Sequence, residues 1–405
     1  MNKKIETHLI IVGAGASGLL ASILASRHGK SVLLLEQNTK VGKKILVSGN
    51  GKCNIGNTHI ASHQYHSSNP SFIEEVLDGY DAQTIKSLFA DMGLLLIEGK
   101  EGKLFPMSMQ SSSVVEILLY EAQRVGVEIL CDCRVESISL QQELFILQTT
   151  QGQKRAKELL LASGSPAVPK LGGSFSGLEM AQSLGHTLIP SYPSLVQLCS
   201  DEPWVKEAMG VKCEALVKLY ANSEYITQKQ GDILFTNYGI SGLAILDISR
   251  AVSIELANYS YCSLSIDLLP HLSKEQLIQL LLRHHSDATR PLALWLQGVL
   301  NKKLIPIILL QSKTKATVVE ELNRKEITKI VYAIKNMKLS ISKTKGFENA
   351  EVAIGGVDTS EVNAKTMESK IIKNLYFAGE ILDVDGNRGG FNFHFAWVSA
   401  LRMNE

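Results

Sequence analysis

Apolar and polar positions near the N-terminus follow the order strand, turn, helix, strand. Leu9–Val12 is continuously apolar, as a strand buried on both faces of a parallel sheet requires. A glycine-rich turn and a helical segment over Ala16–Gly29 follow, and Ser31–Glu36 is a second apolar strand. This order of elements predicts a Rossmann unit.

The next part of the chain, up to about residue 190, continues to alternate between helical and strand-like segments. Glycines mark most of the boundaries, as is typical of turns and helix ends. The pattern predicts helices over Phe72–Met92 and Ser111–Gly126, a hairpin over Leu94–Phe105, paired strands over Val127–Leu140 and Leu144–Thr150, and a strand over Leu159–Ala162.

From about Pro190 the pattern changes. Short alternating segments with turn signals predict a β-rich region over 193–268, and helical periodicity dominates 273–340. From Lys345 the alternation of strand and glycine turn returns. Two segments with Rossmann character therefore flank one long insertion. Within it we expect strands over Ala215–Ala221, Asp232–Thr236 and Tyr261–Asp267, and helices over Ser273–His284, Leu292–Leu300 and Lys325–Met337.

Composition limits the function classes only slightly. A chain of 405 residues is too long for one typical domain and predicts two or three. The formal net charge of +1 argues against nucleic acid as the main partner. No run of about 18 apolar residues occurs, so no membrane span is expected. Six cysteines without a CxxC spacing indicate reduced thiols in a cytoplasmic protein.

The turn after the first strand has the spacing G-x-G-x-x-G, and an acid, Glu36, ends the second strand. This is the context that a dinucleotide site requires. Gly13 permits the tight turn, Gly15 lets backbone approach a pyrophosphate, and Gly18 permits close packing of helix on sheet. The helix start offers free N–H groups to the pyrophosphate, and Glu36 is expected to accept hydrogen bonds from ribose hydroxyls.

A polar, glycine-rich segment follows this acid. It covers residues 42–54, and its two lysines, Lys43 and Lys44, are expected to lie near phosphates. Gly49 and Gly51 flank an asparagine, which predicts positive backbone dihedral angles and a close approach of backbone to the far end of a cofactor. A solvated surface loop is the alternative interpretation of the lysines.

The C-terminal stretch predicts a second edge of the same site. Asn374–Glu380 has the pattern of a strand that ends in a glycine and an acid, Asp383–Gly390 is a polar glycine loop, and Phe391–Leu401 has helical spacing. Gly389 and Gly390 are expected to present backbone N–H groups to an electron-rich ring.

Four segments carry a resemblance to a known family: Ile11–Gly18, Gly42–Asn54, Gly231–Gly242, and Thr366–Lys370 running into Leu375–Gly386. The chain resembles the BaiN/YhiN-type bacterial flavoproteins, which are FAD-dependent oxidoreductases; some members are named aminoacetone oxidases. The resemblance spans essentially the whole chain. It implies an α/β fold, in which a Rossmann-type FAD-binding domain, split in sequence, surrounds an inserted β-barrel-like domain and a small helical domain.

The resemblance and the changes in hydrophobic pattern along the chain together give the domain bounds. They place the FAD-binding domain at 1–190 and 345–405, the β-rich domain at 191–270 and about 338–345, and the helical insert at 271–337. It implies an extended FAD with adenosine at Glu36 and flavin between the Ser48–Asn54 loop and the Gly389–Asn392 turn. The cofactor-binding residues expected are Gly13, Gly15, Ala16, Ser17, Gly18, Glu36, Gln37, Lys43, Lys44, Ser48, Gly49, Gly51, Lys52, Cys53, Asn54, Val135, Ala162, Ser163, Gly164, Gly379, Glu380, Asp385, Gly389, Gly390, Phe391 and Asn392.

The reaction expected is transfer of a hydride or electron pair between flavin and a small organic substrate. NAD(P)H as a transient electron donor stays open, because no second G-x-G-x-x-G follows, and so does an amine oxidase that uses oxygen. Lys52, Cys53 and His394 are candidates for proton transfer or substrate contact. The alternatives are a solvated or phosphate-binding lysine, a packed thiol and a packing histidine.

Other classes remain in competition at this point. One is a non-catalytic flavin-binding or redox-sensing protein, and another is a plain NAD dehydrogenase, against which the 42–54 segment argues. A flavin-dependent enzyme that modifies nucleic acid is disfavoured by the near-zero net charge. No metal site is expected, since His59, His63 and His66 fit no standard zinc spacing. The partner expected is a small-molecule substrate, without nucleic acid or membrane, and the oligomeric state is unknown.

Overall fold

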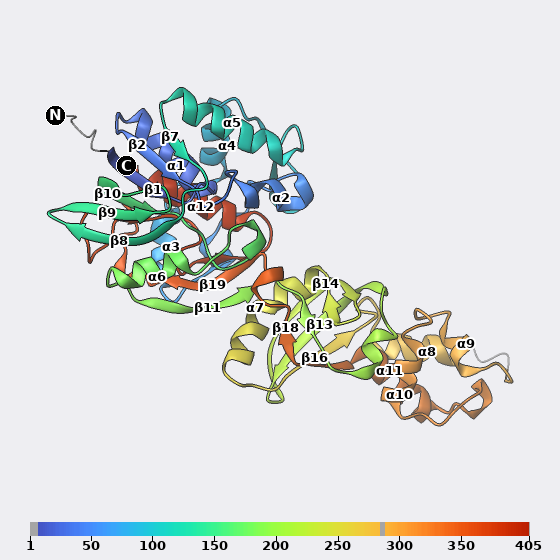
Figure 1. The fold of residues 1–405 in the computed structure, drawn as a ribbon. Helices are drawn as coiled ribbons and strands as arrows, with labels where there is room; N and C mark the ends of the chain where they lie inside the picture. The colour runs from blue at the N-terminus through green and yellow to red at the C-terminus, as the bar shows by residue number, and fades with distance from the viewer. Residues whose placement is uncertain (1–6, 284–287, 405) are drawn as a thin grey trace, which may run out of the picture. The chain divides into compact units, whose positions relative to one another are not determined.

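The computed structural model describes residues 7–283 and 288–404. The chain divides into two compact units, the first made of Met1–Tyr192 and Val352–Glu405 and the second of Pro193–Glu351. Figure 1 shows the blue N-terminal elements and the red C-terminal helix in the same unit. The first unit is thus assembled from both ends of the chain.

The first unit is built around a seven-stranded sheet with the strand order β7-β2-β1-β10-β9-β8, in which β20 also pairs with β10. Its strands are β1 (Thr7–Val12), β2 (Val32–Leu35), β7 (Glu128–Leu130), β8 (Val135–Gln141), β9 (Leu144–Thr149), β10 (Lys154–Leu161) and β20 (Leu375–Phe377). The strands β7, β2, β1, β10 and β20 run parallel, whereas β9 and β8 are antiparallel. Their carboxyl ends therefore meet at one edge.

The remaining elements of the first unit are helices and the strands of smaller, separate sheets. The helices are α1 (Ala16–Arg27), α2 (Lys43–Gly51), α3 (Pro70–Leu77), α4 (Ala82–Asp91), α5 (Ser111–Arg124), α6 (Ser176–Ser183) and α12 (Phe391–Arg402), and the further strands are β3 (Gly56–Asn57), β4 (Tyr65–His66), β5 (Leu96–Glu98), β6 (Lys103–Pro106), β11 (Leu188–Ser194), β19 (Val352–Val357) and β21 (Asp385–Gly386). Leu9, Ile10 and Ile11 of β1 are fully buried, which explains why this strand is apolar on both faces.

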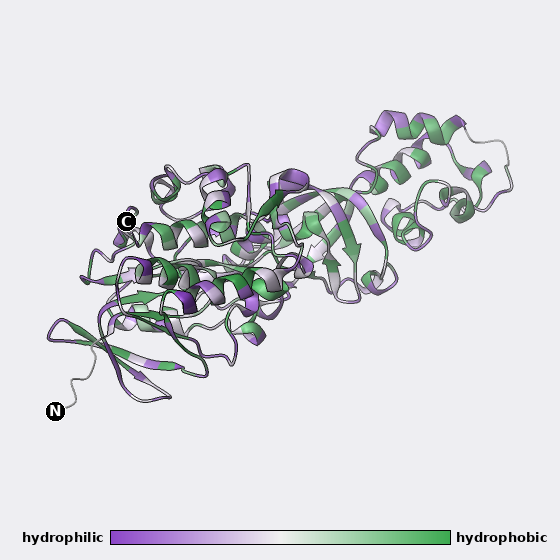
Figure 2. Ribbon diagram, turned by 90° about the horizontal axis from the view of Figure 1, so that it is seen from above, coloured by the Kyte–Doolittle hydropathy of each residue, from purple (hydrophilic) through white to green (hydrophobic). Residues whose placement is uncertain are grey.

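The second unit has a core of its own beneath a seven-stranded sheet with the order β17-β16-β13-β14-β15-β12-β18. Its strands are β12 (Leu198–Cys199), β13 (Lys212–Ala221), β14 (Glu224–Phe235), β15 (Gly239–Ser241), β16 (Cys262–Asp267), β17 (Met337–Ile341) and β18 (Lys343–Thr344). Its helices are α7 (Leu243–Ala257), α8 (Lys274–Arg283), α9 (Leu292–Leu296), α10 (Ile305–Ser312) and α11 (Arg324–Lys335). Green apolar and purple polar residues share the same helices, as Figure 2 shows, and Ile327, Ile330 and Ile334 of α11 are buried at helical spacing.

The predicted fold class is confirmed, but two predicted elements are wrong in detail. The single helix expected over Phe72–Met92 is two helices, because Gly79 has φ +80° and Asp81 accepts a hydrogen bond from the backbone of Thr84 at 2.8 Å, which begins α4. The strand expected over Val127–Leu140 is also divided, since Asp132 adopts φ +55° between β7 and β8.

Four helices of the described residues were not predicted from the sequence. These are α6, α7, α10 and the helical start of α2, where a loop was expected. The helix expected over Ser273–His284 is present as α8, and its last residue, His284, lies outside the described residues.

Candidate functional site

The glycine turn after β1 has a separate geometric reason for each glycine. Gly13 adopts φ +104°, and a Cβ there would lie 2.5 Å from the carbonyl oxygen of Ala162. At Gly18 a Cβ would lie 1.9 Å from the Gly13 oxygen, so helix and turn are in direct contact. A Cβ on Gly15 would meet no atom within 4 Å, and Gly15 begins α1 without a side-chain cap. This open helix start is a cradle for an anionic group such as a pyrophosphate.

Glu36 is 8% exposed and lies directly after β2. Its Oε2 accepts a hydrogen bond from the Ala14 backbone N–H at 3.0 Å, and its Oε1 accepts bonds from the backbone and side chain of Asn38 at 2.9 and 2.6 Å. A carboxylate has about four acceptor positions, so one remains for a ribose hydroxyl. Asn38, which the sequence analysis missed, could have been suspected as a polar residue two positions after the acid.

The C-terminal strand meets the glycine turn directly. Ser17 donates a hydrogen bond through Oγ to the carbonyl oxygen of Ala378 at 3.3 Å, and a Cβ on Gly379 would lie 2.6 Å from the same Oγ. Ser399 of α12 accepts a hydrogen bond from the Gly379 backbone at 2.9 Å. The two ends of the chain are therefore joined at the carboxyl edge of the sheet.

The two lysines of the 42–54 segment are engaged with the protein. Lys44 forms an ion pair with Glu380, with Nζ and Oε2 separated by 2.8 Å, and Lys43 donates to Asn38 Oδ1 at 2.8 Å. The other carboxylate oxygen of Glu380, Oε1, is buried without a partner in the described part of the chain. A buried acceptor of this kind fits a hydroxyl group of a bound ligand.

The segment that carries the predicted flavin loop turns sharply after the start of α2. Gly49 and Gly51 have φ of +56° and +80°, which confirms the positive dihedral angles predicted for them. Ser48 leaves the helical conformation and donates through Oγ to Ile45. Asn54 Oδ1 is buried and has no partner among the described residues, so it too can serve a ligand.

The Ser48–Asn54 loop and the Gly389–Asn392 turn lie together. Gly390 has φ +100°, and a Cβ there would lie 2.7 Å from Asn54 Oδ1 and 2.4 Å from the carbonyl oxygen of Gly56. Asn57, which the sequence analysis missed, donates from Nδ2 to the Gly389 oxygen at 2.9 Å. Gly390 also begins α12 without a side-chain cap, which leaves backbone N–H groups at this end of the cradle.

The remaining predicted cofactor residues have the following positions. Ala162 donates its N–H to Val12, and Ser163 has a buried Oγ without a described partner. Val135 begins β8, two residues after Cys133, whose N–H donates to the Glu36 backbone oxygen. A Cβ on Gly164 would meet open space, and the Gln37 side chain donates to the backbone oxygen of Gly172. Asp385 in β21 and Phe391 are both buried. The side chain of Asn392 accepts from the backbone N–H of Gly386 and donates to its backbone oxygen.

Comparison with known proteins now decides the family. The model for the HI0933-like protein Rossmann domain matches residues 7–405. The chain belongs to this family. It is 35% identical, over 96% of both chains, to a 3-dehydro-bile acid delta(4,6)-reductase from Clostridium scindens, and 33% identical, again over 96% of both, to a ribosomal RNA dihydrouridine synthase from Haemophilus influenzae. Membership confirms the resemblance seen in the sequence.

A solved structure shares the fold of this HI0933-like protein. The 3-ketosteroid delta1-dehydrogenase from Sterolibacterium denitrificans has a TM-score of 0.53, with 10% identity over 98% of both chains. At that identity the likeness concerns the fold alone. The family and the cradle together make the chain an oxidoreductase with an FAD-binding Rossmann unit.

The three candidate catalytic residues of this HI0933-like chain have different surroundings. Lys52 is exposed. Cys53 is fully buried, and burial raises the pKa of its thiol to about 11. His394 is fully buried, and burial lowers its pKa to about 4; Nε2 lies 3.1 Å from the Tyr80 oxygen, so Nε2 carries the proton and the ring is neutral at pH 7. Their catalytic roles stay predictions.

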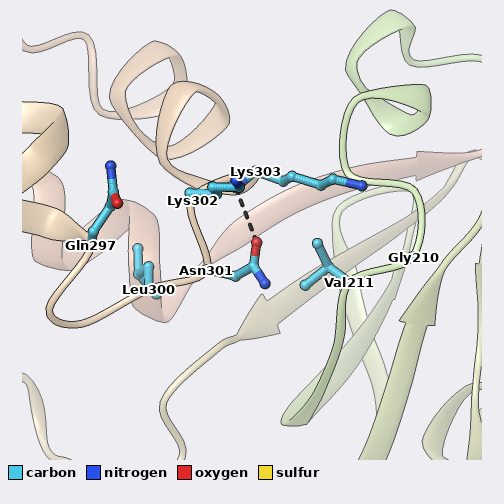
Figure 3. A pocket seen from close by; sticks show the side chains of 7 residues that line it. All are labelled: Gly210, Val211, Gln297, Leu300, Asn301, Lys302 and Lys303. Carbon is cyan, nitrogen blue, oxygen red and sulfur yellow. Dashed lines mark hydrogen bonds between the residues drawn. The ribbon is translucent and has the colours of Figure 1, made fainter.

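A separate pocket of about 510 Å³ lies in the second unit (Figure 3). Its lining residues are Gly210, Val211, Gln297, Leu300, Asn301, Lys302 and Lys303. Lys303 donates from Nζ to the Met209 oxygen at 2.6 Å, and its N–H donates to Asn301 at 3.0 Å. None of the predicted cofactor residues belongs to this pocket.

No helix within 7–283 and 288–404 is both long and apolar enough to cross a membrane. In the same ranges, no three His, Cys, Asp or Glu side chains come together in a way that could hold a metal ion. His66 lies near Asn387, with Nε2 and Oδ1 3.3 Å apart, while His59 donates its N–H to Asn57.

Proposed function

We propose that the chain is an FAD-dependent reductase of carbon–carbon double bonds conjugated to a carbonyl group. The observation that carries the cofactor part is the junction of the two chain ends, where Ser17 bonds to Ala378 and the Asn54 loop contacts Gly390. NAD alone would use only the glycine turn and Glu36. The second cradle around Asn54 and Gly390 supports a longer nucleotide.

Different residues of the chain bind different parts of this cofactor. The N–H groups at the start of α1 bind the pyrophosphate, and Glu36 accepts from the adenosine ribose. Glu380 Oε1 and Asn54 Oδ1 accept from hydroxyl or N–H groups of the cofactor, since both lack partners in the described chain. When bound, the flavin supplies hydride transfer. Backbone N–H groups from Gly390 to Asn392 stabilise negative charge near the ring.

The substrate class rests on the names of the two relatives. A delta(4,6)-reductase and a dihydrouridine synthase both add two hydrogens to a carbon–carbon double bond. In a 3-dehydro-bile acid and in uracil that bond is conjugated to a carbonyl group, which activates it for hydride addition. We extend this shared chemistry to the present chain, with NAD(P)H as the electron donor. An amine oxidase that uses oxygen is the alternative.

A second candidate, reduction of a base in RNA, is supported by the distribution of charge. Residues 271–337 contain eleven Lys and Arg against five Asp and Glu, a net charge of +6, although the whole chain carries only +1. Lys302, Lys313 and Lys315 are exposed, and no ion pair engages them within the described chain. Basic surfaces of this kind bind phosphate backbones. The absence of a nucleic-acid partner, expected from the sequence, therefore needs a direct test.

The experiment has two stages. Purified protein is first examined for visible flavin absorbance, and the chromophore released by heat is identified by mass. After anaerobic reduction with NADH or NADPH, the reduced protein is offered conjugated ketones, uridine and ribosomal RNA, whereas the oxidised protein is offered amines. A colourless protein that does not take up FAD contradicts the cofactor. Bleaching of the oxidised flavin by amines, without reoxidation of the reduced flavin by any conjugated ketone, uridine or RNA, contradicts the reductase. The unpaired state of all six cysteines supports a cytoplasmic location.

A further inference from the structure

Two buried polar atoms of the second unit have no hydrogen-bond partner in the described chain. They are Gln197 Oε1 and Thr236 Oγ1. Buried polar groups in proteins are nearly always hydrogen-bonded, so each exception needs an explanation. Neither residue belongs to the cofactor cradle, whose residues all lie in the first unit.

The two side chains lie on the same face of the sheet. Leu198, Phe235 and Ile240 belong to the buried core of the second unit. Gln197 directly precedes β12, and Thr236 directly follows β14. Because successive side chains of extended backbone point to opposite faces, both are expected on the face opposite Leu198 and Phe235. The strand β12 is placed between β15 and β18, to which it pairs antiparallel.

A lysine without a carboxylate partner shares this face. The backbone N–H of Lys345 donates to the backbone carbonyl oxygen of Gln197 at 2.9 Å, and Lys345 Nζ lies 4.5 Å from the centre of the Tyr238 ring. No ion pair involves Lys345 within the described residues. Burial raises the pKa of Cys199, while the charges of Lys345 and Lys343 oppose that rise. Lys343 lies opposite Cys199, and Lys345 follows in the same strand edge, so both lysines lie beside β12.

We propose that Lys345, Tyr238, Thr236 and Gln197 form a binding site for a small organic carboxylate that also carries a hydroxyl group. The Lys345 ammonium and the Thr236 hydroxyl donate to the carboxylate, which is the strong, charge-assisted arrangement. The Gln197 carbonyl oxygen accepts from the ligand hydroxyl. Such a ligand satisfies both buried groups that lack partners.

The length of the ligand follows from the register of the strands. Thr236 donates its N–H to Gly239, and Gly239 lies opposite Cys199, two residues beyond Gln197. Gln197 and Thr236 are therefore two strand spacings and two residues apart, which separates their side chains by roughly 12 Å. The ligand must therefore be longer than acetate, and an aromatic ring between its two polar ends fits this span.

The site also accounts for the segment Gly231–Gly242, which the resemblance singled out without a role. A Cβ on Gly239 would lie 2.1 Å from the Leu198 oxygen, and one on Gly242 would lie 2.4 Å from the Asp232 oxygen. These glycines let β15 lie close to β12 and β14. The close approach brings the Thr236–Tyr238 turn beside β12.

The test uses the full-length protein saturated with FAD and 4-hydroxycinnamate as the probe, with binding measured by calorimetry. Lys345→Met is expected to weaken binding about tenfold. The matched control is Lys338→Met, because Lys338 also stands over a tyrosine of this sheet, with Nζ 4.9 Å from the Tyr220 ring. The control should change binding by less than about twofold. Gln197→Leu is expected to weaken 4-hydroxycinnamate about fivefold and to leave cinnamate, which lacks the hydroxyl, unchanged.

Two outcomes overturn the site. One is equal affinity of wild type, Lys345→Met and Lys338→Met, and the other is no saturation of the wild type up to about 10 mM probe. Binding is read without turnover, so this result is independent of the reductase proposal. Loss of the flavin absorbance in the same samples would count against the cofactor cradle instead.

Discussion

Glu36 accepts a hydrogen bond from the backbone N–H of Ala14, at a distance of 3.0 Å. The acid that follows β2 therefore fixes the turn that follows β1. Its second oxygen accepts from Asn38, so the carboxylate is held on both sides before any ligand arrives. Preorganised polar groups of this kind lower the cost of binding.

Replacing Glu36 by Gln should therefore weaken FAD binding about tenfold or more, since a neutral amide loses charge-assisted hydrogen bonds. Titration of FAD into apoprotein, followed by flavin fluorescence, measures the dissociation constant. Glu128→Gln is the control, because Glu128 is an exposed acid at the start of a neighbouring parallel strand. Equal effects of the two substitutions would show that Glu36 has no special role.

Substitution by alanine should weaken FAD binding at Gly15 and destabilise the fold at Gly18. The Gly15 Cβ would meet no atom within 4 Å, so Gly15→Ala should leave the urea midpoint of the apoprotein unchanged and weaken FAD binding, since the methyl group enters the ligand space. The Gly18 Cβ would lie 1.9 Å from the Gly13 oxygen, so Gly18→Ala should destabilise the fold by about 1–3 kcal/mol. A reversed pattern would refute this assignment.

His394 should make the free energy of unfolding depend on pH. Burial lowers its pKa from 6.5 to about 4, so the folded protein binds fewer protons than the unfolded chain between these values. The free energy of unfolding should then fall as the pH drops from 6.5 to about 4, by about 3 kcal/mol from this residue. Urea titrations across this range measure the effect.

The control for this pH effect is His394→Gln, a polar side chain that does not titrate. Its unfolding free energy should fall less steeply with acidification than that of the wild type. His28, an exposed histidine, gives the matched comparison as His28→Gln. Parallel curves for wild type and His394→Gln would mean that His394 titrates normally.

Cys53 should be the least reactive of three compared cysteines. Burial raises its pKa to about 11, and the side chain has no exposed surface. At neutral pH its alkylation by iodoacetamide should be at least about a hundredfold slower than in the unfolded protein. Cys131 and Cys213, both partly exposed, should be labelled first. Peptide mass spectrometry over time gives the rates; early labelling of Cys53 would revive a nucleophilic role.

The sequence predicted those parts of the fold whose cause is local. The apolar run before Gly13 is a buried strand, Gly15 and Gly18 have the geometry expected, and Glu36 stands after the second strand. The positive dihedral angles at Gly49 and Gly51 were also predictable, because glycines around an asparagine favour that conformation. By contrast, the divided helix at Gly79 was missed, since its apolar spacing continues across the break.

Contacts between distant parts of the chain were decided by the tertiary structure. The bond of Ser17 to Ala378 and the approach of Gly390 to Asn54 join residues more than three hundred positions apart, which no local pattern can specify. Burial of Cys53 likewise depends on packing from several elements.

The amino-acid sequence by itself thus determined a glycine turn of the kind that dinucleotide sites use, the acid after the second strand and a split Rossmann unit, because turn chemistry and hydrophobic periodicity act over a few residues. Only the tertiary structure decided which polar atoms are left without partners, such as Glu380 Oε1 and Thr236 Oγ1. Hydrogen bonding depends on neighbours brought together in three dimensions, and these atoms are where ligands are expected to bind.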